Sequence, residues 1–254
     1  MGITFPNESA EHRAARDRLL DKEIELRRAM EAVAVARRAL PPGGLVPEDY
    51  VFDGLGQDGK PAKIKLSELF DEGKDTLIVY NMMFPRYKGD DRAKPATGPL
   101  ASLPIEETPC PSCTGLLDQL DGAVGHLEAA GFNFVVVAKS PIERVIAFAR
   151  DRGWKNMRLL SSAGNSFKRA YQAEDEEGQL SPMVSVFHRD PDGIRHFWSS
   201  ELVYAPKDPG QDMRAAGTLE PLWNLMDLTP EGRPDFNEQM QYDCCDGAKP
   251  QKAA

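Results

Sequence analysis

Short hydrophobic runs alternate with hydrophobic stripes of helical period through most of the chain. Runs rich in Val, Ile, Phe and Tyr predict strands at residues 50–52, 62–64, 76–80, 132–138 and 157–160. Hydrophobic residues three or four positions apart predict helices over 113–131 and 140–153, and shorter helical turns at 66–70 and 165–171. The run that starts at residue 76 continues through Phe84, which is typical of a central strand covered on both faces.

The C-terminal third of the chain contains a hairpin. Residues 183–187 and 194–198 predict two strands, and Asp190-Pro-Asp-Gly193 between them supplies the turn chemistry. A last helix is predicted over roughly 218–226. Strands that alternate with helices and end in a hairpin predict an α/β domain with a mixed sheet and helices on both of its faces.

Two local signals mark the starts of predicted helices. Ser9 can cap a long helix over residues 9–40, which Pro41-Pro42-Gly43-Gly44 ends. Ser140-Pro141-Ile142-Glu143 has the residues of a capping box at the start of the later helix. The pattern therefore predicts an N-terminal helical extension (1–44), a domain (45–236) and a polar C-terminal tail (237–254). The first helix is either solvated or the surface of a homodimer.

Residues 85–109 contain five prolines and little periodicity, which indicates a long surface loop. Four basic residues lie in it with two aspartates, Asp90 and Asp91, among them, so we interpret this stretch as solvated. The basic residues are Arg86, Lys88, Arg92 and Lys94. Loops of this length are uncommon in compact domains unless they are functional or mobile, and this one could cover a neighbouring site.

Composition narrows the range of partners and compartments. The net charge of −9 argues against general binding to nucleic acid or anionic membranes. No hydrophobic run is long enough to cross a bilayer, and the first residues lack the pattern of a secretory signal, so we expect a cytoplasmic protein without membrane contact. Four cysteines in 254 residues do not form a disulfide scaffold. In a reducing compartment a close pair is more often catalytic or metal-binding.

Cys110-Pro111-Ser112-Cys113 lies between the loop and a predicted helix. At a helix N-terminus the unpaired amides and the macrodipole stabilise a thiolate, which can lower a cysteine pKa from about 8.5 to between about 3.5 and 7.5. We expect Cys110 to be the more exposed cysteine and the nucleophile, and Cys113 to resolve the mixed disulfide. Pro111 restricts the ring and removes an amide that no helix bond would use.

The order of elements resembles that of thioredoxin-like proteins. In that superfamily a Cys-x-x-Cys heads a helix, and a proline before the penultimate strand is cis and lies against the cysteines. By this resemblance Pro182 is the equivalent proline and Ser181 its neighbour in the site. The resemblance implies a substrate groove formed by Pro111, Ser112, Ser181 and Pro182.

Four motifs together resemble a bacterial family of unknown function, DUF899, described as thioredoxin-like and as predicted dithiol–disulfide oxidoreductases. They are Cys110-Pro-Ser-Cys113, Arg158-Leu-Leu-Ser-Ser-Ala-Gly-Asn165, Asp192-Gly-Ile-Arg-His-Phe-Trp198 and Asp227-Leu-Thr-Pro-Glu-Gly-Arg233. The similarity extends from the N-terminal helix to about Phe236. It implies a thioredoxin-like three-layer sandwich with a mixed central sheet. It also implies exchange with a protein or small-molecule thiol or disulfide, without a bound cofactor.

A peroxiredoxin-like peroxidase is the nearest enzymatic alternative. Residues 160–171 and the hairpin after them resemble that branch of the superfamily. Peroxiredoxins place a threonine three residues before the reactive cysteine, whereas Glu107 holds that position here and Thr108 lies two before Cys110. This difference disfavours peroxide chemistry.

Two further alternatives concern the same thiols. Cys110 and Cys113 could supply half of a zinc site, with Cys244 and Cys245 as the other half, although adjacent cysteines are awkward ligands for one tetrahedral ion. The site is therefore expected to hold no metal. A thioredoxin-like module that binds partners without redox turnover is the non-enzymatic alternative. Cys244 and Cys245 are interpreted as exposed tail thiols, with a relay of oxidation to Cys113 as the sharper hypothesis.

Overall fold

A computed structural model describes residues 3–56, 58–206, 208–209, 214 and 217–242. The chain divides into two compact units, Met1–Gly43 and Gly44–Ala254. No helix among the described residues is both long enough and apolar enough to cross a membrane.

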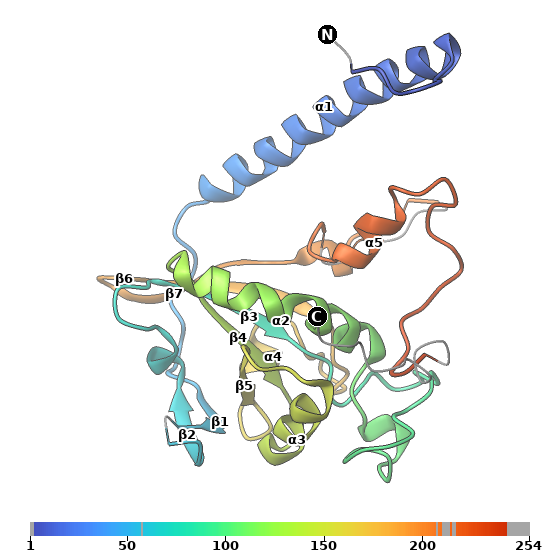
Figure 1. The fold of residues 1–254 in the computed structure, drawn as a ribbon. Helices are drawn as coiled ribbons and strands as arrows, with labels where there is room; N and C mark the ends of the chain where they lie inside the picture. Colours follow the sequence, from blue (N-terminus) through green and yellow to red (C-terminus); the bar gives the residue numbers. More distant parts are fainter. Residues whose placement is uncertain (1–2, 57, 207, 210–213, 215–216, 243–254) are drawn as a thin grey trace. The chain divides into compact units, whose positions relative to one another are not determined.

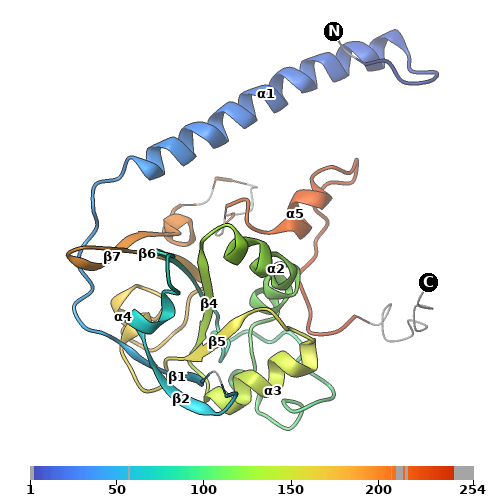
Figure 2. The same ribbon diagram turned by 60° about the vertical axis from the view of Figure 1, so that its left-hand side comes forward.

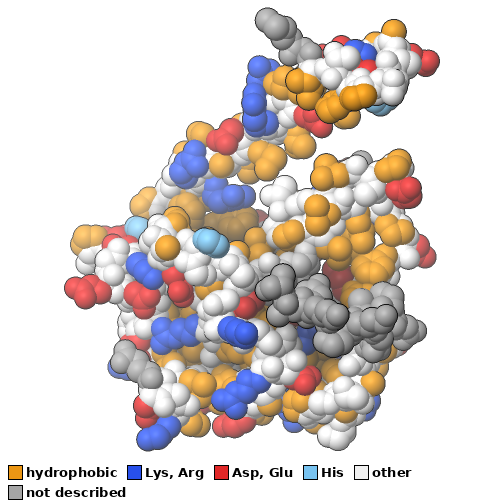
Figure 3. Space-filling model, viewed as in Figure 1, with side chains coloured by type: hydrophobic (Ala, Val, Ile, Leu, Met, Phe, Trp, Pro, Cys, Tyr) orange, Lys and Arg blue, Asp and Glu red, His pale blue; other side chains and the backbone are white. Residues whose placement is uncertain are grey.

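The first unit contains one long helix, α1 (Ala10–Arg38). Ser9 caps it as predicted, because the Ser9 hydroxyl accepts a hydrogen bond from the His12 amide at 3.1 Å. No residue of α1 is buried, and hydrophobic side chains such as Leu26 and Met30 are exposed. Figure 3 shows hydrophobic and charged side chains side by side along this helix. A homodimer formed through this helix stays a prediction.

The second unit is built on a seven-stranded mixed sheet with the order β2-β1-β5-β4-β3-β6-β7 (Figures 1 and 2). Its strands are β1 (Val51–Leu55), β2 (Pro61–Lys65), β3 (Thr76–Asn81), β4 (Asn133–Ala138), β5 (Arg158–Ser161), β6 (Met183–Asp190) and β7 (Gly193–Ser199). Strands β3, β4 and β5 are parallel, whereas β6 and β7 form the predicted antiparallel hairpin beside β3. Every predicted strand is present, and the ends differ by a few residues.

Among the described residues of the second unit, four α-helices connect these strands or follow them. They are α2 (Pro111–Ala129), α3 (Ile142–Arg152), α4 (Phe167–Ala170) and α5 (Pro221–Met226). Short 3₁₀ turns occur at Leu66–Leu69, Ile105–Glu107 and Glu201–Tyr204. The capping box predicted at Ser140 is absent, because the Ser140 amide donates to the Phe84 carbonyl and the helix starts two residues later. The last helix likewise begins later than predicted, at Pro221, which suits a first helical position.

Two clusters of buried hydrophobic side chains cover the two faces of the sheet. One joins α2 and α3 to the face that carries Tyr80 and Val136. The other joins Phe167 of α4 to the face that carries Val79 and Phe187. The sheet is therefore a middle layer between helices, and the second unit has the predicted three-layer α/β architecture with a mixed central sheet. Cys110 and Cys113 both belong to the first cluster. The four residues Cys110-Pro111-Ser112-Cys113 are called the tetrad below.

Candidate active site

Backbone hydrogen bonds fix Cys110 at the start of α2. Cys110 is the N-cap residue, and Pro111 is the first residue of the helix. The Cys110 amide donates to the Met83 carbonyl at 2.9 Å, just beyond the end of β3. Its own carbonyl accepts bonds from the Thr114 amide and hydroxyl, both at 3.0 Å. The tetrad therefore lies where the sequence predicted it, at a helix N-terminus beside a central strand.

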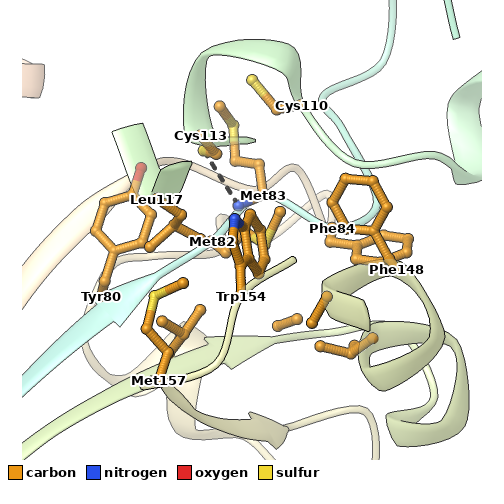
Figure 4. Close-up of a cluster of buried hydrophobic side chains, with 14 of the residues drawn as sticks. Tyr80, Met82, Met83, Phe84, Cys110, Cys113, Leu117, Phe148, Trp154 and Met157 are labelled. Atoms are coloured by element: carbon orange, nitrogen blue, oxygen red, sulfur yellow. Dashed lines mark hydrogen bonds between the residues drawn. The ribbon is translucent and has the colours of Figure 1, made fainter. Parts of the chain in front are cut away.

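Both cysteines are free thiols buried within the core cluster (Figure 4). Each is only 1% exposed, so the prediction that Cys110 is the more exposed cysteine is wrong. The reason is a cover that comes from two parts of the chain distant in sequence, the loop before α2 and the segment after α5.

The loop contributes Arg92, whose guanidinium lies against the tetrad. Arg92 Nη2 is 3.4 Å from Cys110 Sγ, and Nη1 donates to the Ser112 hydroxyl at 2.7 Å. Two further bonds, at 2.9 Å and 2.7 Å, join the guanidinium to the carboxylate of Asp90. The side chain of Arg86 is fully buried and donates to the Arg92 carbonyl at 2.6 Å. Our interpretation of this stretch as solvated is therefore wrong for Arg86 and Arg92, which are part of the site.

The second part of the cover is the C-terminal strap, defined here as residues 237–242. Glu238 is buried, and its carboxylate accepts a hydrogen bond from the Ser112 hydroxyl at 3.0 Å. The Glu238 carbonyl is 3.4 Å from Arg92 Nη1, so strap and loop meet at the same guanidinium. Met240 is buried in the core cluster, and its carbonyl accepts from Arg152 of α3 at 2.8 Å. The start of the predicted tail thus packs on the site.

The two thiols have opposite ionisation behaviour. Hydrogen bonding from the Cys113 thiol and the charge of Arg92 lower the pKa of Cys110 to about 6. Burial raises the pKa of Cys113 well above its usual value, and the interaction with Cys110 raises it further. At neutral pH Cys110 is therefore mainly a thiolate and Cys113 mainly a thiol. A thiolate beside a protonated thiol can act as a nucleophile with a resolving partner at hand.

Three polar groups that the sequence did not single out lie close to Cys113, namely the Met83 amide, Tyr80 and Lys168. The Met83 amide donates to Cys113 Sγ at 3.5 Å, and burial, together with Cys113, raises the pKa of Tyr80 well above its usual value (Figure 4). Lys168 of α4 is buried and donates to the Met82 carbonyl at 3.0 Å. No sequence motif identifies Lys168, because a single lysine in a short amphipathic segment is normally expected to be exposed at the surface.

The remaining predicted residues are placed as follows. Ser181 and Pro182 are half-buried and immediately precede β6, whose first residue, Met183, pairs with Asn81 at the end of β3. The Ser181–Pro182 peptide bond is trans. Within the described ranges, the cis bond joins Phe84 to Pro85.

Cys244 and Cys245 lie outside the described residues. No cluster of three or more His, Cys, Asp or Glu side chains in the described part of the chain could hold a metal ion. Glu107, at the position where peroxiredoxins carry threonine, forms an ion pair with Arg144 at 2.9 Å.

Comparisons with known proteins place this geometry in context. A family model described as a bacterial protein of unknown function (DUF899) matches residues 3–246. No curated protein matches the chain.

Several solved structures are similar to the chain at low identity. A 2-Cys peroxiredoxin of Plasmodium vivax is 12% identical, with a TM-score of 0.42 over 61% of this chain and 82% of that one. AhpC of Enterococcus faecalis is 13% identical, with a TM-score of 0.42 over 76% of this chain and 98% of that one. A hypothetical protein of Sinorhizobium meliloti 1021 is 17% identical, with a TM-score of 0.39 over 70% and 80%. Likenesses at this level carry no argument about the reaction.

Proposed function

The chain belongs to the DUF899 family of bacterial proteins of unknown function, and we propose that it catalyses thiol–disulfide exchange at Cys110 and Cys113. The observation that carries the proposal is the asymmetry of the pair. Cys110 has a pKa lowered to about 6 by hydrogen bonding from Cys113 and by Arg92, whereas burial keeps Cys113 protonated. Apolar burial alone would raise the pKa of both thiols, so two inert buried cysteines would not show one lowered and one raised pKa.

The reaction balances with the thiols as the only electron carriers. The Cys110 thiolate attacks one sulfur of a substrate disulfide, so that a mixed disulfide forms and the other substrate sulfur leaves as a thiolate. Cys113 then loses its proton to water and attacks the Cys110 sulfur. The Cys110–Cys113 bond forms, the mixed disulfide breaks, and the substrate has gained two electrons that the pair has lost. The reverse sequence oxidises a dithiol substrate.

Substrate access requires the cover to open, because both sulfurs are buried. Ser112 and Arg92 hold Glu238 in the closed arrangement, so these contacts are the ones that an incoming disulfide displaces. Pro111 and Ser112 then form the near wall of the groove, and Ser181 and Pro182 before β6 form the other wall. The substrate is a protein or small-molecule disulfide or dithiol, and the cytoplasm is the expected compartment.

The test combines an insulin-reduction assay with thiol mapping. We expect wild-type chain to reduce insulin with dithiothreitol as the electron donor, and Cys110→Ser to have no activity above background. Cys113→Ser should accumulate a mixed disulfide on Cys110, because the resolving thiol is missing. The double variant Cys244→Ser/Cys245→Ser is the matched control, since it removes two thiols outside the tetrad.

Each alternative predicts a different outcome. Wild-type activity no higher than that of Cys110→Ser, with no Cys110–Cys113 bridge at any thiol-to-disulfide ratio, would identify a binding module instead. Rapid peroxide consumption that depends on Cys110 would identify a peroxidase. Stoichiometric zinc by metal analysis would identify a metal site. A bridge confined to Cys110 and Cys113 after mild oxidation would exclude a relay through Cys244 or Cys245.

A further inference from the structure

Lys168 is a buried cation close to the cysteine pair, and the exchange steps described above do not use it. Its side chain comes from α4 and is 1% exposed. Lys168 Nζ donates to the Met82 carbonyl oxygen at 3.0 Å. Burial lowers the pKa of Lys168 to about 7. Burying an ammonium group costs free energy unless nearby polar or charged groups compensate its charge, so the groups around Lys168 decide whether it stays protonated.

A single peptide group connects Lys168 to Cys113. The Met82 carbonyl and the Met83 amide belong to the same peptide bond, and the Met83 amide donates to Cys113 Sγ at 3.5 Å (Figure 4). In a trans peptide the C=O and N–H bonds point in opposite directions, so the negative end of the dipole faces Lys168 and the positive end faces Cys113. An ammonium at one end polarises the hydrogen bond at the other, and burial strengthens this effect.

We propose that Lys168 is a positioning residue that stabilises the Cys113 thiolate through the Met82–Met83 peptide group while Cys113 resolves a mixed disulfide. The inference rests on the proposed function, since it concerns the second step of the exchange. In that step Cys113 gives its proton to water, its sulfur bonds to Cys110, and the substrate leaves as a thiolate. Lys168 exchanges no electrons. It makes the thiolate easier to form at a place where burial opposes it.

The other charged groups near Lys168, Glu174 and Lys139, form an ion pair with each other. Glu174 and Lys139 act on Lys168 electrostatically, as Cys113 does. The buried carboxylate of Glu174 is paired with Lys139 and with Arg169, the latter at 3.0 Å. Lys139 therefore offers a matched control, because it is a second lysine beside Glu174 whose ammonium contacts this carboxylate.

The experiment measures each thiol separately by its rate of iodoacetamide alkylation at pH 6, followed by peptide mass. Lys168 is mostly protonated at this pH, whereas it is mostly neutral at the higher pH where Cys113 ionises. In a Cys110→Ser background, Lys168→Met is expected to slow alkylation of Cys113 about tenfold, which is the loss of thiolate that corresponds to one pKa unit. With Cys110 present, the same substitution should slow resolution of a mixed disulfide at pH 6 about tenfold. Lys168→Arg should recover part of the loss, and Lys139→Met should change neither quantity. The alkylation rate of Cys110 in a Cys113→Ser background should not change on Lys168→Met.

Three results would overturn the inference. They are an unchanged alkylation rate of Cys113 at pH 6, an equal change at Cys110, or the same effect from Lys139→Met. If Lys168→Met does not fold, the amide chemical shift of Met83 in the wild-type chain decides, because it should follow the titration of Lys168 near pH 7. A Met83 shift that stays flat through this range overturns the inference. Slower alkylation of Cys113 in Lys168→Met, in a chain without exchange activity, supports the thiolate stabilisation and overturns only the proposed function.

Discussion

Removing the guanidinium of Arg92 should make Cys110 a weaker acid. Arg92 Nη2 is 3.4 Å from Cys110 Sγ, and the charge of Arg92 is among the causes of the lowered pKa of Cys110. In Arg92→Met the thiolate loses this partner. Asp90 also loses its main counterion and is left with the more distant Arg86, 3.7 Å away. Both changes disfavour a negative charge on Cys110.

The size of the effect follows from the strength of one hydrogen bond to a charged group. Such a bond contributes about 1.5–3 kcal/mol, which corresponds to a shift of about 1–2 pKa units. The pKa of Cys110 should therefore rise from about 6 to roughly 7–8. At pH 6 the thiolate fraction would fall from about one half to between roughly one tenth and one hundredth.

The assay is the rate of iodoacetamide alkylation of Cys110 as a function of pH, followed by peptide mass. The midpoint of the profile reports the pKa, whereas the plateau at high pH also reflects access to the sulfur. Arg144→Met is the matched control, because it removes an arginine that pairs with Glu107 at the surface. A midpoint in Arg92→Met within about 0.3 units of wild type would refute the assignment of Arg92 as the stabilising charge.

Two further predictions concern the cover and the core. Deletion of residues 237–254 should speed alkylation of Cys110 at least about fivefold, because the strap's contacts with Ser112 and Arg92 contribute about 0.5–1.5 kcal/mol each. An unchanged rate would show that the strap does not limit access. Leu117→Ala, in the cluster that holds both cysteines, should lower the free energy of unfolding measured in urea by about 2–5 kcal/mol. Leu225→Ala, at an exposed site, should change it by less than about 0.5 kcal/mol. Similar losses at the two sites would contradict the burial argument.

The sheet was predictable because its strands are short hydrophobic runs bounded by turn residues. The hairpin at Asp190 to Gly193 is a clear case, since the Asp190 carboxylate accepts the amides of Asp192 and Gly193 at 2.9 Å and 3.1 Å. Local signals failed where a tertiary bond competed with them. Ser140 has the chemistry of a helix cap, but its amide donates to the Phe84 carbonyl, so the helix starts at Ile142.

The place of the cysteine pair at a helix start was predictable from the sequence, but the residues that lower or raise the pKa values of its thiols were not. Arg92 and Asp90 form a charged pair within a proline-rich loop, and such a pair is normally solvated. Only the folded chain shows that the loop turns back over α2. Lys168 is separated from Cys113 by 55 positions (168 − 113) and is linked to it through the Met82–Met83 peptide group. An interaction through the backbone produces no sequence motif. Hydrogen bonds of this kind depend on topology, not on local pattern.

The contact between Arg92 and Cys110 has a consequence for the reduction potential. The contact exists for a thiolate and loses its charge complement once a disulfide forms, so it stabilises the reduced state selectively. For a two-electron couple, each 1.4 kcal/mol of such stabilisation raises the potential by about 30 mV, which makes the disulfide a stronger oxidant. In the exchange reaction that we propose, a residue of the proline-rich loop, outside the Cys-Pro-Ser-Cys tetrad, would therefore help to set the direction of electron transfer.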